Sequence, residues 1–399
     1  MSEEAVYTRI TPRDLGFKLQ KVRKLAGMTQ EQVADKLDMA RTTLIAIEKG
    51  DRRLSNSELH QFAQLYKTSV HELLSEQQQF KALVPQFRTA FGKTFDDSSD
   101  WGKAAAKLEQ LSRFYCEVEE LVGDRLARKY PPIKDIAATA EYIDQAAADT
   151  AAEERNRLGL GDSPIGDLVN ILEDVGLRIF HFDMYDKDLA GIFAYDDIMG
   201  GCIGLSNKQP MARRRWTLAH EYGHFLSSRL EADIATYTSK KSRLLNERFA
   251  DGFAANFLMP QTSLNRKYSE LLQNRPSPSV ADLCGLAHQF GVSLEAITLR
   301  LENIRRLKAQ TWEGLKSRGL KPQKAMVTLG YKQPEIEPDK FTSRYMFLAV
   351  QAHQKGLISM DKLCAFLEIS DEMEVRQMMD KSRHSLEVSQ ELDLFLEIQ

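Results

Sequence analysis

The chain has 399 residues, of which 43% are hydrophobic and 28% are charged, and its formal net charge is −3. This length allows two or three domains with sizeable cores, and no apolar run approaches the roughly 18–20 residues that a membrane span requires. The opening Met-Ser-Glu-Glu does not have the form of a signal peptide, and the 4 cysteines are isolated. We therefore expect a cytoplasmic protein with reduced cysteines and no membrane partner.

The N-terminal segment is predicted to be a bundle of short helices. Residues 9–53 carry 11 Lys/Arg against 6 Asp/Glu, a local positive excess in an otherwise slightly acidic chain. Thr29 and Gln32 have the spacing of a capping box. A turn at residues 38–40 separates two short helices, which is the pattern of a helix-turn-helix. The predicted helices cover residues 14–26, 30–37, 41–48, 57–67 and 70–74.

These residues resemble the Xre-type domain of phage repressors over about 60 residues. The apolar residues at the family's core positions are Val33, Ala34, Leu37, Leu44 and Ile47. The resemblance implies a five-helix domain over residues 1–78 that binds a double-stranded DNA operator. In that arrangement Gln30 contacts a phosphate, while Arg41, Thr42 and Thr43 reach base edges in the major groove.

Two further expectations concern this segment. Asp38 stands where the family usually has Gly, and Asp tolerates a left-handed turn, so the turn is expected to form. A single domain of this kind binds DNA weakly, so we expect a homodimer on a palindromic site. A small helical bundle that makes only protein contacts is the alternative.

Residues 79–135 are predicted to be a helical linker that ends at the Pro-Pro pair 131–132. Its apolar residues step by 3 and 4, which is close to a heptad seam. They are Leu108, Leu111, Tyr115, Val118 and Val122. This seam would either pair two subunits or pack against its own chain.

The next stretch is predicted to contain helices over residues 133–157 and 164–175, then short strands over 177–180, 192–194 and 202–205. The last two strands suggest a small antiparallel sheet. An edge of this sheet is expected to hold an extended peptide as an added strand. The arginine run 213–215 is interpreted as a solvated helix face, and contact with a phosphate or an acidic substrate is the alternative.

The central motif is His220-Glu221-x-x-His224. Two histidines four residues apart lie on one face of a helix, where they can hold one zinc ion through ring nitrogens. Glu221 would then take a proton from a metal-bound water. Apolar neighbours on both sides of the motif indicate a buried helix rather than a solvated one.

A third zinc ligand is expected on the following helix. Glu247 and Asp251 are four residues apart and share a face, so Glu247 can bind the metal while Asp251 fixes the tautomer of a ligand histidine. The alternative is that both are simply acidic residues favoured in the first turns of a helix. Four tyrosines are candidates for the oxyanion donor, and the sequence does not choose among them. They are Tyr185, Tyr195, Tyr222 and Tyr237.

Residues 246–251 resemble the Asn-Glu-x-x-x-Asp element of thermolysin-like gluzincins. The wider pattern resembles the ImmA/IrrE family of zinc metallopeptidases over roughly residues 135–305. Its parts are residues 163–165, the strands between 189 and 205, Asn207, 218–224 and 253–260. The resemblance implies zinc-dependent cleavage of a partner protein, typically a repressor with a helix-turn-helix domain.

The expected architecture is mainly α, with an α+β part. A gluzincin-like metallopeptidase domain over residues 136–310 follows the linker and closes with a second helical pair at 283–290 and 294–301. Residues 311–399 form a C-terminal helical unit that acts as a sensor or caps the core, with a helical segment over 341–369 interrupted at 356–359.

Three functional hypotheses follow from these motifs. The first is a transcriptional repressor with a built-in zinc endopeptidase, which cleaves itself or a partner repressor after a signal such as stress or DNA damage. The second is a non-catalytic DNA-binding regulator whose metallopeptidase fold senses a ligand or metal. The third is a peptidase that uses the N-terminal domain only to recruit substrate. Retention of Glu221 favours an enzyme, because sensing needs metal ligands but no general base.

Overall fold

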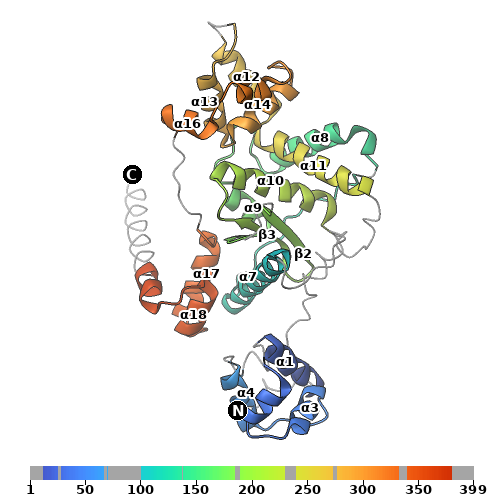
Figure 1. Ribbon diagram of the computed structural model, residues 1–399, viewed down its shortest axis with the longest axis vertical. Helices are drawn as coiled ribbons and strands as arrows, with labels where there is room; N and C mark the ends of the chain where they lie inside the picture. The colour runs from blue at the N-terminus through green and yellow to red at the C-terminus, as the bar shows by residue number, and fades with distance from the viewer. Residues whose placement is uncertain are drawn as a thin grey trace, which may run out of the picture. The chain divides into compact units, whose positions relative to one another are not determined.

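The computed structural model describes residues 12–25, 28–66, 70, 100–136, 138–184, 189–229, 240–272, 276–331 and 339–379. The chain divides into two compact units, Met1–Phe80 and Lys81–Gln399 (Figure 1). None of the helices described is long and apolar enough to cross a membrane.

The first unit is a bundle of short helices around a small apolar core. Its described helices are α1 (Pro12–Leu25), α2 (Gln30–Lys36), α3 (Arg41–Lys49) and α4 (Asn56–Leu65). These four confirm the predicted helices to within two residues. The predicted fifth helix, residues 70–74, lies outside the described residues apart from Val70.

Local side-chain chemistry sets the boundaries of these helices. Thr29 caps α2 and Ser55 caps α4, each in a complete capping box. Asp38 has φ 50°, so it makes the left-handed turn that the sequence predicted. The turn joins α2 to α3 and lets Val33 and Leu44 meet in the buried core.

A buried ion pair holds α3 against the rest of this unit. Arg23 of α1 donates from Nε to Glu48 Oε1 at 2.6 Å and from Nη2 to Oε2 at 3.1 Å. Gln30 Nε2 also donates to Glu48, at 2.8 Å. Glu48 is only 5% exposed, so these three donors compensate its buried charge and fix the angle between the helices.

The second unit contains a three-stranded sheet, with β1 (Arg178–Phe182) and β2 (Gly191–Asp196) on either side of β3 (Gly200–Ser206). The predicted antiparallel pair β2–β3 is confirmed. The strand predicted at residues 177–180 is also present as β1, and it runs parallel to β3, a pairing that the sequence did not predict. After β1 the chain forms β2 at the opposite edge of the sheet and then β3 between them. Among the described residues, no strand pairs with the outer edge of β2.

Helix α10 (Met211–Ser228) packs on β2 and β3, and α11 (Lys240–Leu258) packs on α10 (Figure 1). On its other side α11 contacts α8 (Ile143–Arg157). Aromatic rings fill the space between these helices, among them Tyr222, Phe253 and Phe257. The sheet, α10, α11 and α8 therefore lie in successive layers, and the buried face of each helix is directed toward its neighbour.

The first helix predicted after the linker begins later than expected. A 3₁₀ turn (Ala140–Tyr142) precedes α8, and α9 (Leu168–Val175) starts after its N-cap Asp167 rather than at Pro164. Residues 124–135 have no helix and make backbone hydrogen bonds to other segments, such as Lys134 N to Leu226 O at 2.9 Å. Pro131 and Pro132 have no N–H to give a helix, so an extended path is favoured there.

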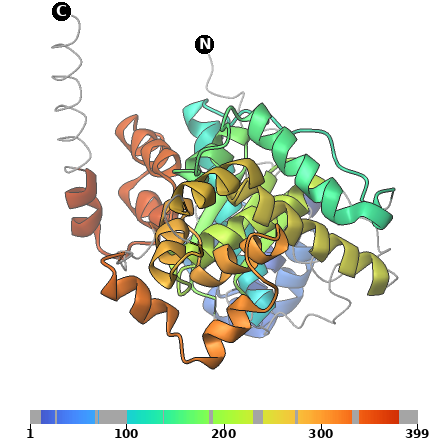
Figure 2. The ribbon, with the colours of Figure 1, turned by 90° about the horizontal axis from the view of Figure 1, so that it is seen from above.

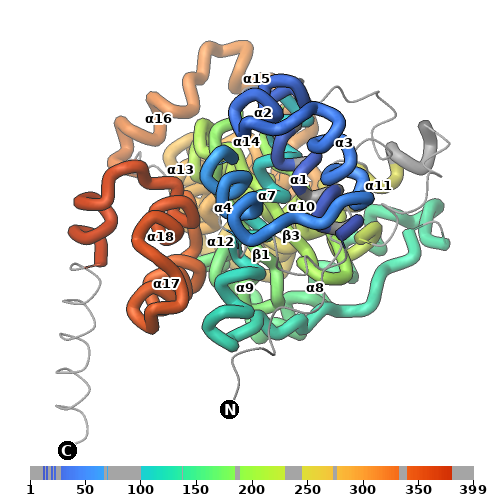
Figure 3. The backbone as a smooth tube through the Cα atoms, turned by 90° about the horizontal axis from the view of Figure 1, so that it is seen from below, coloured from blue at the N-terminus to red at the C-terminus, as the bar shows by residue number. Residues whose placement is uncertain are grey.

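Helix α7 (Asp100–Val122) uses its apolar seam within its own unit. Leu108, Leu111, Tyr115 and Val118 are buried, and α7 contacts β1, β3 and α17 (Ser343–Gln354). This is the intramolecular one of the two predicted alternatives. Helix α17 ends at Gln354 and α18 spans Met360–Leu367, so the predicted interruption at residues 356–359 is confirmed. Figure 3 shows the two helices side by side.

A group of short helices follows α11, and Figure 2 looks down on it. The predicted pair is confirmed, because α13 (Val280–Phe290) and α14 (Leu294–Asn303) are joined at Gly291, which has a left-handed conformation. The remaining helices of this group are α12 (Gln261–Leu271), α15 (Thr311–Ser317) and α16 (Pro322–Thr328).

The closeness of α10 and α11 depends on Gly223. A Cβ at this position would lie 2.9 Å from Ala250 Cα, a backbone atom that cannot turn away. We predict that Gly223→Ala lowers the free energy of unfolding by about 1–2 kcal/mol, since overpacking of about 1–3 kcal/mol exceeds the gain in helix propensity of about 1 kcal/mol. Urea unfolding followed by circular dichroism measures this. Gly166→Ala is the control, because a Cβ there meets nothing within 4 Å; equal midpoints for the two variants would contradict the close-packing argument.

Candidate metal centre

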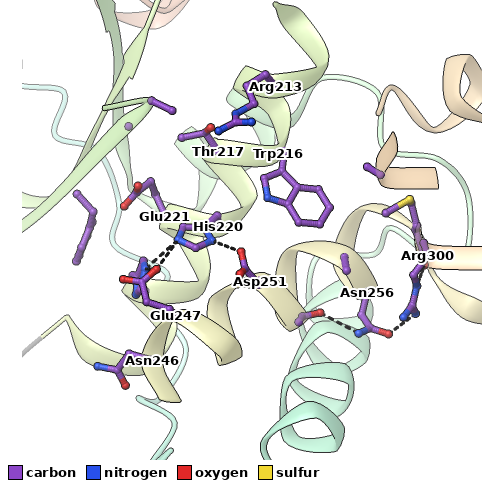
Figure 4. Close-up of a pocket in the computed structure, with 18 of the residues that line it drawn as sticks. Arg213, Trp216, Thr217, His220, Glu221, Asn246, Glu247, Asp251, Asn256 and Arg300 are labelled. Atoms are coloured by element: carbon purple, nitrogen blue, oxygen red, sulfur yellow. Dashed lines mark hydrogen bonds and ion pairs between the residues drawn. The ribbon is translucent and has the colours of Figure 1, made fainter. Parts of the chain in front are cut away.

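Helix α10 carries His220 and His224 one turn apart. Figure 4 shows His220 directed toward Glu247 and Asp251 of α11. The Nε2 atoms of the two histidines lie 3.0 Å apart, and the rings are nearly perpendicular, at 79°. Both side chains are partly buried, with relative exposures of 18% and 17%. Two imidazole nitrogens that converge in this way have their lone pairs directed at one shared point.

Glu247 of α11 completes a triangle with the two histidines. Its Oε2 lies 3.5 Å from His220 Nε2 and 3.8 Å from His224 Nε2. These are the three residues among those described that could hold a metal ion together. Three atoms at such separations are all roughly 2.0 Å from a common centre, which is the usual Zn–N and Zn–O distance. Two imidazoles and one carboxylate therefore fit a zinc ion that keeps one position open for water.

Asp251 lies one turn beyond Glu247 and holds His220 in place. Its Oδ1 is 2.9 Å from His220 Nδ1, so the ring N–H donates to the carboxylate and Nε2 keeps its lone pair for the centre. Burial lowers the pKa of His220, but the hydrogen bonds to Asp251 and Glu247 outweigh that effect and raise the pKa to about 10. The same contacts with His220 and His224 lower the pKa of Glu247. The cluster therefore favours positive charge at its centre, as a metal site does.

Glu221 points from α10 toward the start of β2 (Figure 4). A Cβ on Gly191 would lie 3.1 Å from Glu221 Oε1 and 2.4 Å from Thr217 Cγ2, so only glycine lets the strand approach α10 here. Burial raises the pKa of Glu221. A carboxylate with a raised pKa beside a metal-binding cluster is suited to accept a proton and later release it.

A cavity of about 990 Å³ surrounds these groups. Its walls come from β2, α10, α11 and α14, and the cavity includes the triangle, Glu221 and residues 189–195. Of the four tyrosine candidates for the oxyanion donor, Tyr195 lines the cavity. Tyr222 is fully buried and donates its hydroxyl to Glu154, which removes it from that role. Tyr185 and Tyr237 lie outside the described residues.

The interpretation of the arginine run as a solvated face is wrong for two of its three members. Arg215 donates to the carbonyls of Gly166 at 2.6 Å and Ile165 at 2.7 Å, and Arg214 donates to the carbonyl of Asn207 at 3.2 Å. Carbonyl groups at loop ends need donors, which a charge pattern along one helix does not reveal. Arg213 is exposed and lines the cavity.

The residues expected to contact DNA lie at the starts of α2 and α3. Arg41 and Thr42 are exposed and Thr43 is half-buried, in the first turn of α3. Gln30 opens α2, but its amide nitrogen already donates to Glu48. A phosphate contact from Gln30 would therefore use the second N–H of that amide or the backbone N–H.

Family models match both units of the chain. Residues 172–302 match the model described as the IrrE N-terminal-like domain, and residues 19–73 match the helix-turn-helix model. The fusion of these two domains, expected from the sequence, is confirmed. No curated protein matches the chain.

Two solved structures that match the chain are of ComR proteins from streptococci. One is the crystal structure of ComR from Streptococcus suis, at 13% identity, covering 90% of this chain and 94% of that chain with a TM-score of 0.16. The other is the apo form of the competence regulator ComR from Streptococcus vestibularis, at 14% identity, covering 93% and 98% with a TM-score of 0.16. TM-scores this low do not indicate a shared overall arrangement.

Asp251 is predicted to control metal affinity without touching the metal. Asp251→Asn removes the anionic acceptor for His220 Nδ1–H, and loss of such a partner typically weakens metal binding about 10- to 100-fold. Competition with a fluorescent zinc chelator measures the change. Asp144→Asn is the matched control, because Asp144 also lines the cavity but pairs with Arg248. If both variants bind zinc as tightly as the native chain, Asp251 has no such role.

Proposed function

We propose that this chain, which joins a helix-turn-helix domain to an IrrE N-terminal-like domain, is a DNA-binding transcriptional repressor with a built-in zinc endopeptidase. The observation that carries the proposal is the convergence of His220, His224 and Glu247 beside the half-buried carboxylate of Glu221. Metal binding alone would need only the first three residues. The fourth has a use only if a proton is transferred.

Each residue has a distinct task in peptide hydrolysis. A bound zinc ion would be held by His220, His224 and Glu247, and it would supply the Lewis acid that activates a water near neutral pH. Glu221 accepts the proton of that water and returns it to the nitrogen of the leaving amine. Asp251 keeps His220 in the tautomer whose Nε2 faces the cluster. Of the candidate tyrosines, Tyr195 lines the cavity and is our candidate for the hydrogen-bond donor to the developing oxyanion.

The edge of β2 provides a means of holding the substrate. β2 lies at the end of the sheet order and lines the cavity along residues 191–195. A peptide that adds to this edge as an extra strand forms backbone hydrogen bonds without regard to its sequence. Such a strand would pass directly over Glu221, because Gly191 brings β2 against that side chain.

The position of α7 supports cleavage within the chain itself. Trp101, in the first turn of α7, lines the cavity. A part of the chain that follows the DNA-binding unit in sequence therefore contributes to the wall of the site. A cut between the two units would separate DNA binding from the rest of the molecule. A partner repressor is the other substrate that the proposal allows.

The DNA-binding half of the proposal is that the protein acts in the cytoplasm as a homodimer. Helix α3 would be the recognition helix of each protomer. Arg41 and Thr42 are free to reach base edges, while Arg23 and Glu48 hold α3 rigidly from behind. Because the seam of α7 is buried in its own unit, the pairing of two chains would use a different surface. A signal such as stress or DNA damage would act on the second unit.

Glu221→Gln separates the enzyme from the non-catalytic sensor. We predict that this variant retains zinc and operator binding but loses cleavage, since an amide cannot act as the proton acceptor. Intact mass spectrometry of the chain after incubation with zinc detects self-cleavage, and terminal-peptide proteomics in cells detects cleavage of a partner. Glu295→Gln is the control, because Glu295 lines the same cavity but accepts the Trp312 indole N–H. If the Glu221→Gln variant regulated transcription in cells as the native chain does, the non-catalytic sensor would explain the protein better than the peptidase.

The recognition helix is tested separately. We predict that Arg41→Ala weakens operator binding about tenfold or more and relaxes base preference at one position, because one base contact contributes about 1–3 kcal/mol. Selection of binding sites from random duplexes followed by titration in fixed salt measures both effects. Arg318→Ala removes an exposed positive charge from the second unit and should leave binding unchanged. An equal loss for the two variants would mean that Arg41 contributes only charge.

A further inference from the structure

The cavity has a second chemical feature beyond the metal centre, a buried arginine on α14. Arg300 is 7% exposed and lines the cavity. Its Nη2 donates to Asn256 Oδ1 at 2.5 Å, its Nη1 to Asn303 Oδ1 at 3.2 Å, and its Nε makes a long contact of 3.4 Å with the Met259 carbonyl. Every one of these acceptors is neutral.

Other buried arginines in the chain show what is missing here. Arg23 pairs with Glu48 and Arg178 pairs with Glu119, and in each pair both side chains are less than 10% exposed. Among the residues that the structure describes, no carboxylate forms an ion pair with Arg300. Burial accordingly lowers its pKa to about 10. A buried cation without a counter-charge is costly, so a partner from outside the chain would be strongly favoured.

The hydrogen-bond pattern leaves Arg300 able to bind that partner. A guanidinium has five N–H donors, two on each terminal nitrogen and one on Nε. One N–H of Nη1 and one of Nη2 are used by the asparagines, so one on each remains. Two parallel N–H groups on the terminal nitrogens are the arrangement that holds a carboxylate through both oxygens.

Asn256 fixes the direction of this group. Its Nδ2 donates to the Gly252 carbonyl at 2.8 Å, so the amide cannot flip and Oδ1 stays toward Arg300 (Figure 4). Arg155 provides a contrast. It is also buried without a carboxylate, but it donates to three backbone carbonyls and does not line the cavity. Arg155 therefore stabilises the loop after α8 through hydrogen bonds to backbone carbonyls, whereas Arg300 lines a cavity that a ligand can enter.

The distance from the metal centre suits a peptide. Glu247, Asp251 and Asn256 all line the cavity from α11, and Asn256 is nine residues beyond Glu247. At about 1.5 Å per helical residue this is about 13 Å, which an extended peptide covers in about four residues of about 3.3 Å each.

We propose that Arg300 is a specificity residue that binds a carboxylate of the substrate, about four residues from the bond that is cut. The substrate class is thus a polypeptide with an acidic side chain, or a chain end, at that distance. The inference rests on the proposed peptidase function, and it adds a second anchor to the sequence-independent edge of β2.

The test uses the full-length, zinc-loaded chain and a set of peptides whose only charged side chain is one Asp. The position of this Asp is moved along the peptide from one member of the set to the next. Each peptide has a partner with Asn in place of Asp, and each is made with a free and an amidated C-terminus, which separates a side-chain carboxylate from a terminal one. Mass spectrometry locates the cuts made by the native chain. Fluorescence anisotropy with Glu221→Gln measures binding where no cleavage occurs.

We expect cleavage at a fixed spacing of about four residues from the carboxylate and about tenfold tighter binding of the acidic peptides. Arg300→Gln should abolish this preference, Arg300→Lys should restore part of it, and Arg155→Gln should keep it. The comparison of Asp with Asn peptides uses only chains with native Arg300. A folding defect in Arg300→Gln would therefore not affect that comparison.

The outcomes separate this inference from the proposed function. Cleavage without any difference between Asp and Asn peptides, or an unchanged preference in Arg300→Gln, would overturn the role of Arg300 and leave the peptidase in place. Preferential binding of acidic peptides with no cleavage under any condition would support Arg300 as a carboxylate site and count against the peptidase.

Discussion

The contact between α10 and α11 is the constraint on which the rest of the second unit depends. One helix carries His220 and His224 and the other carries Glu247 and Asp251, so the site exists only while the two axes stay close. Gly223 permits that closeness, and buried aromatic side chains on both helices maintain it. The packing energy of an apolar interface thus keeps together a cluster of charged groups that would otherwise prefer separate hydration.

The electrostatics of the cavity follow from this arrangement. Its centre favours a cation, because Asp251 and Glu247 raise the pKa of His220 while burial beside β2 raises the pKa of Glu221. Its far end holds Arg300, a cation without a carboxylate partner among the described residues. A polypeptide can satisfy both ends at once, with a carbonyl at the metal and a carboxylate at the arginine. The DNA-binding unit has its own core and its own buried ion pair.

Local chemistry determines what could be predicted from the sequence. Helices bounded by caps, such as those after Thr29 and Ser55, were predictable because the signal lies within four residues. His220 and His224 are four residues apart, so their position on one face of a helix was predictable too. The parallel pairing of β1 with β3 was not, since it depends on which edge β2 occupies. Arg300 was missed because its burial and its neutral partners arise only when α14 meets α11. The assignments of DNA contacts remain predictions.

The central claim is that one zinc ion is bound by His220, His224 and Glu247. Zinc-edge X-ray absorption of the full-length chain, purified without added metal, tests it most directly, together with the metal content of the same sample. The account predicts one zinc per chain surrounded by nitrogen and oxygen at roughly 2.0–2.1 Å, with the scattering pattern of two imidazoles. A chain that retains no stoichiometric metal, or zinc bound by sulfur at about 2.3 Å, would contradict it.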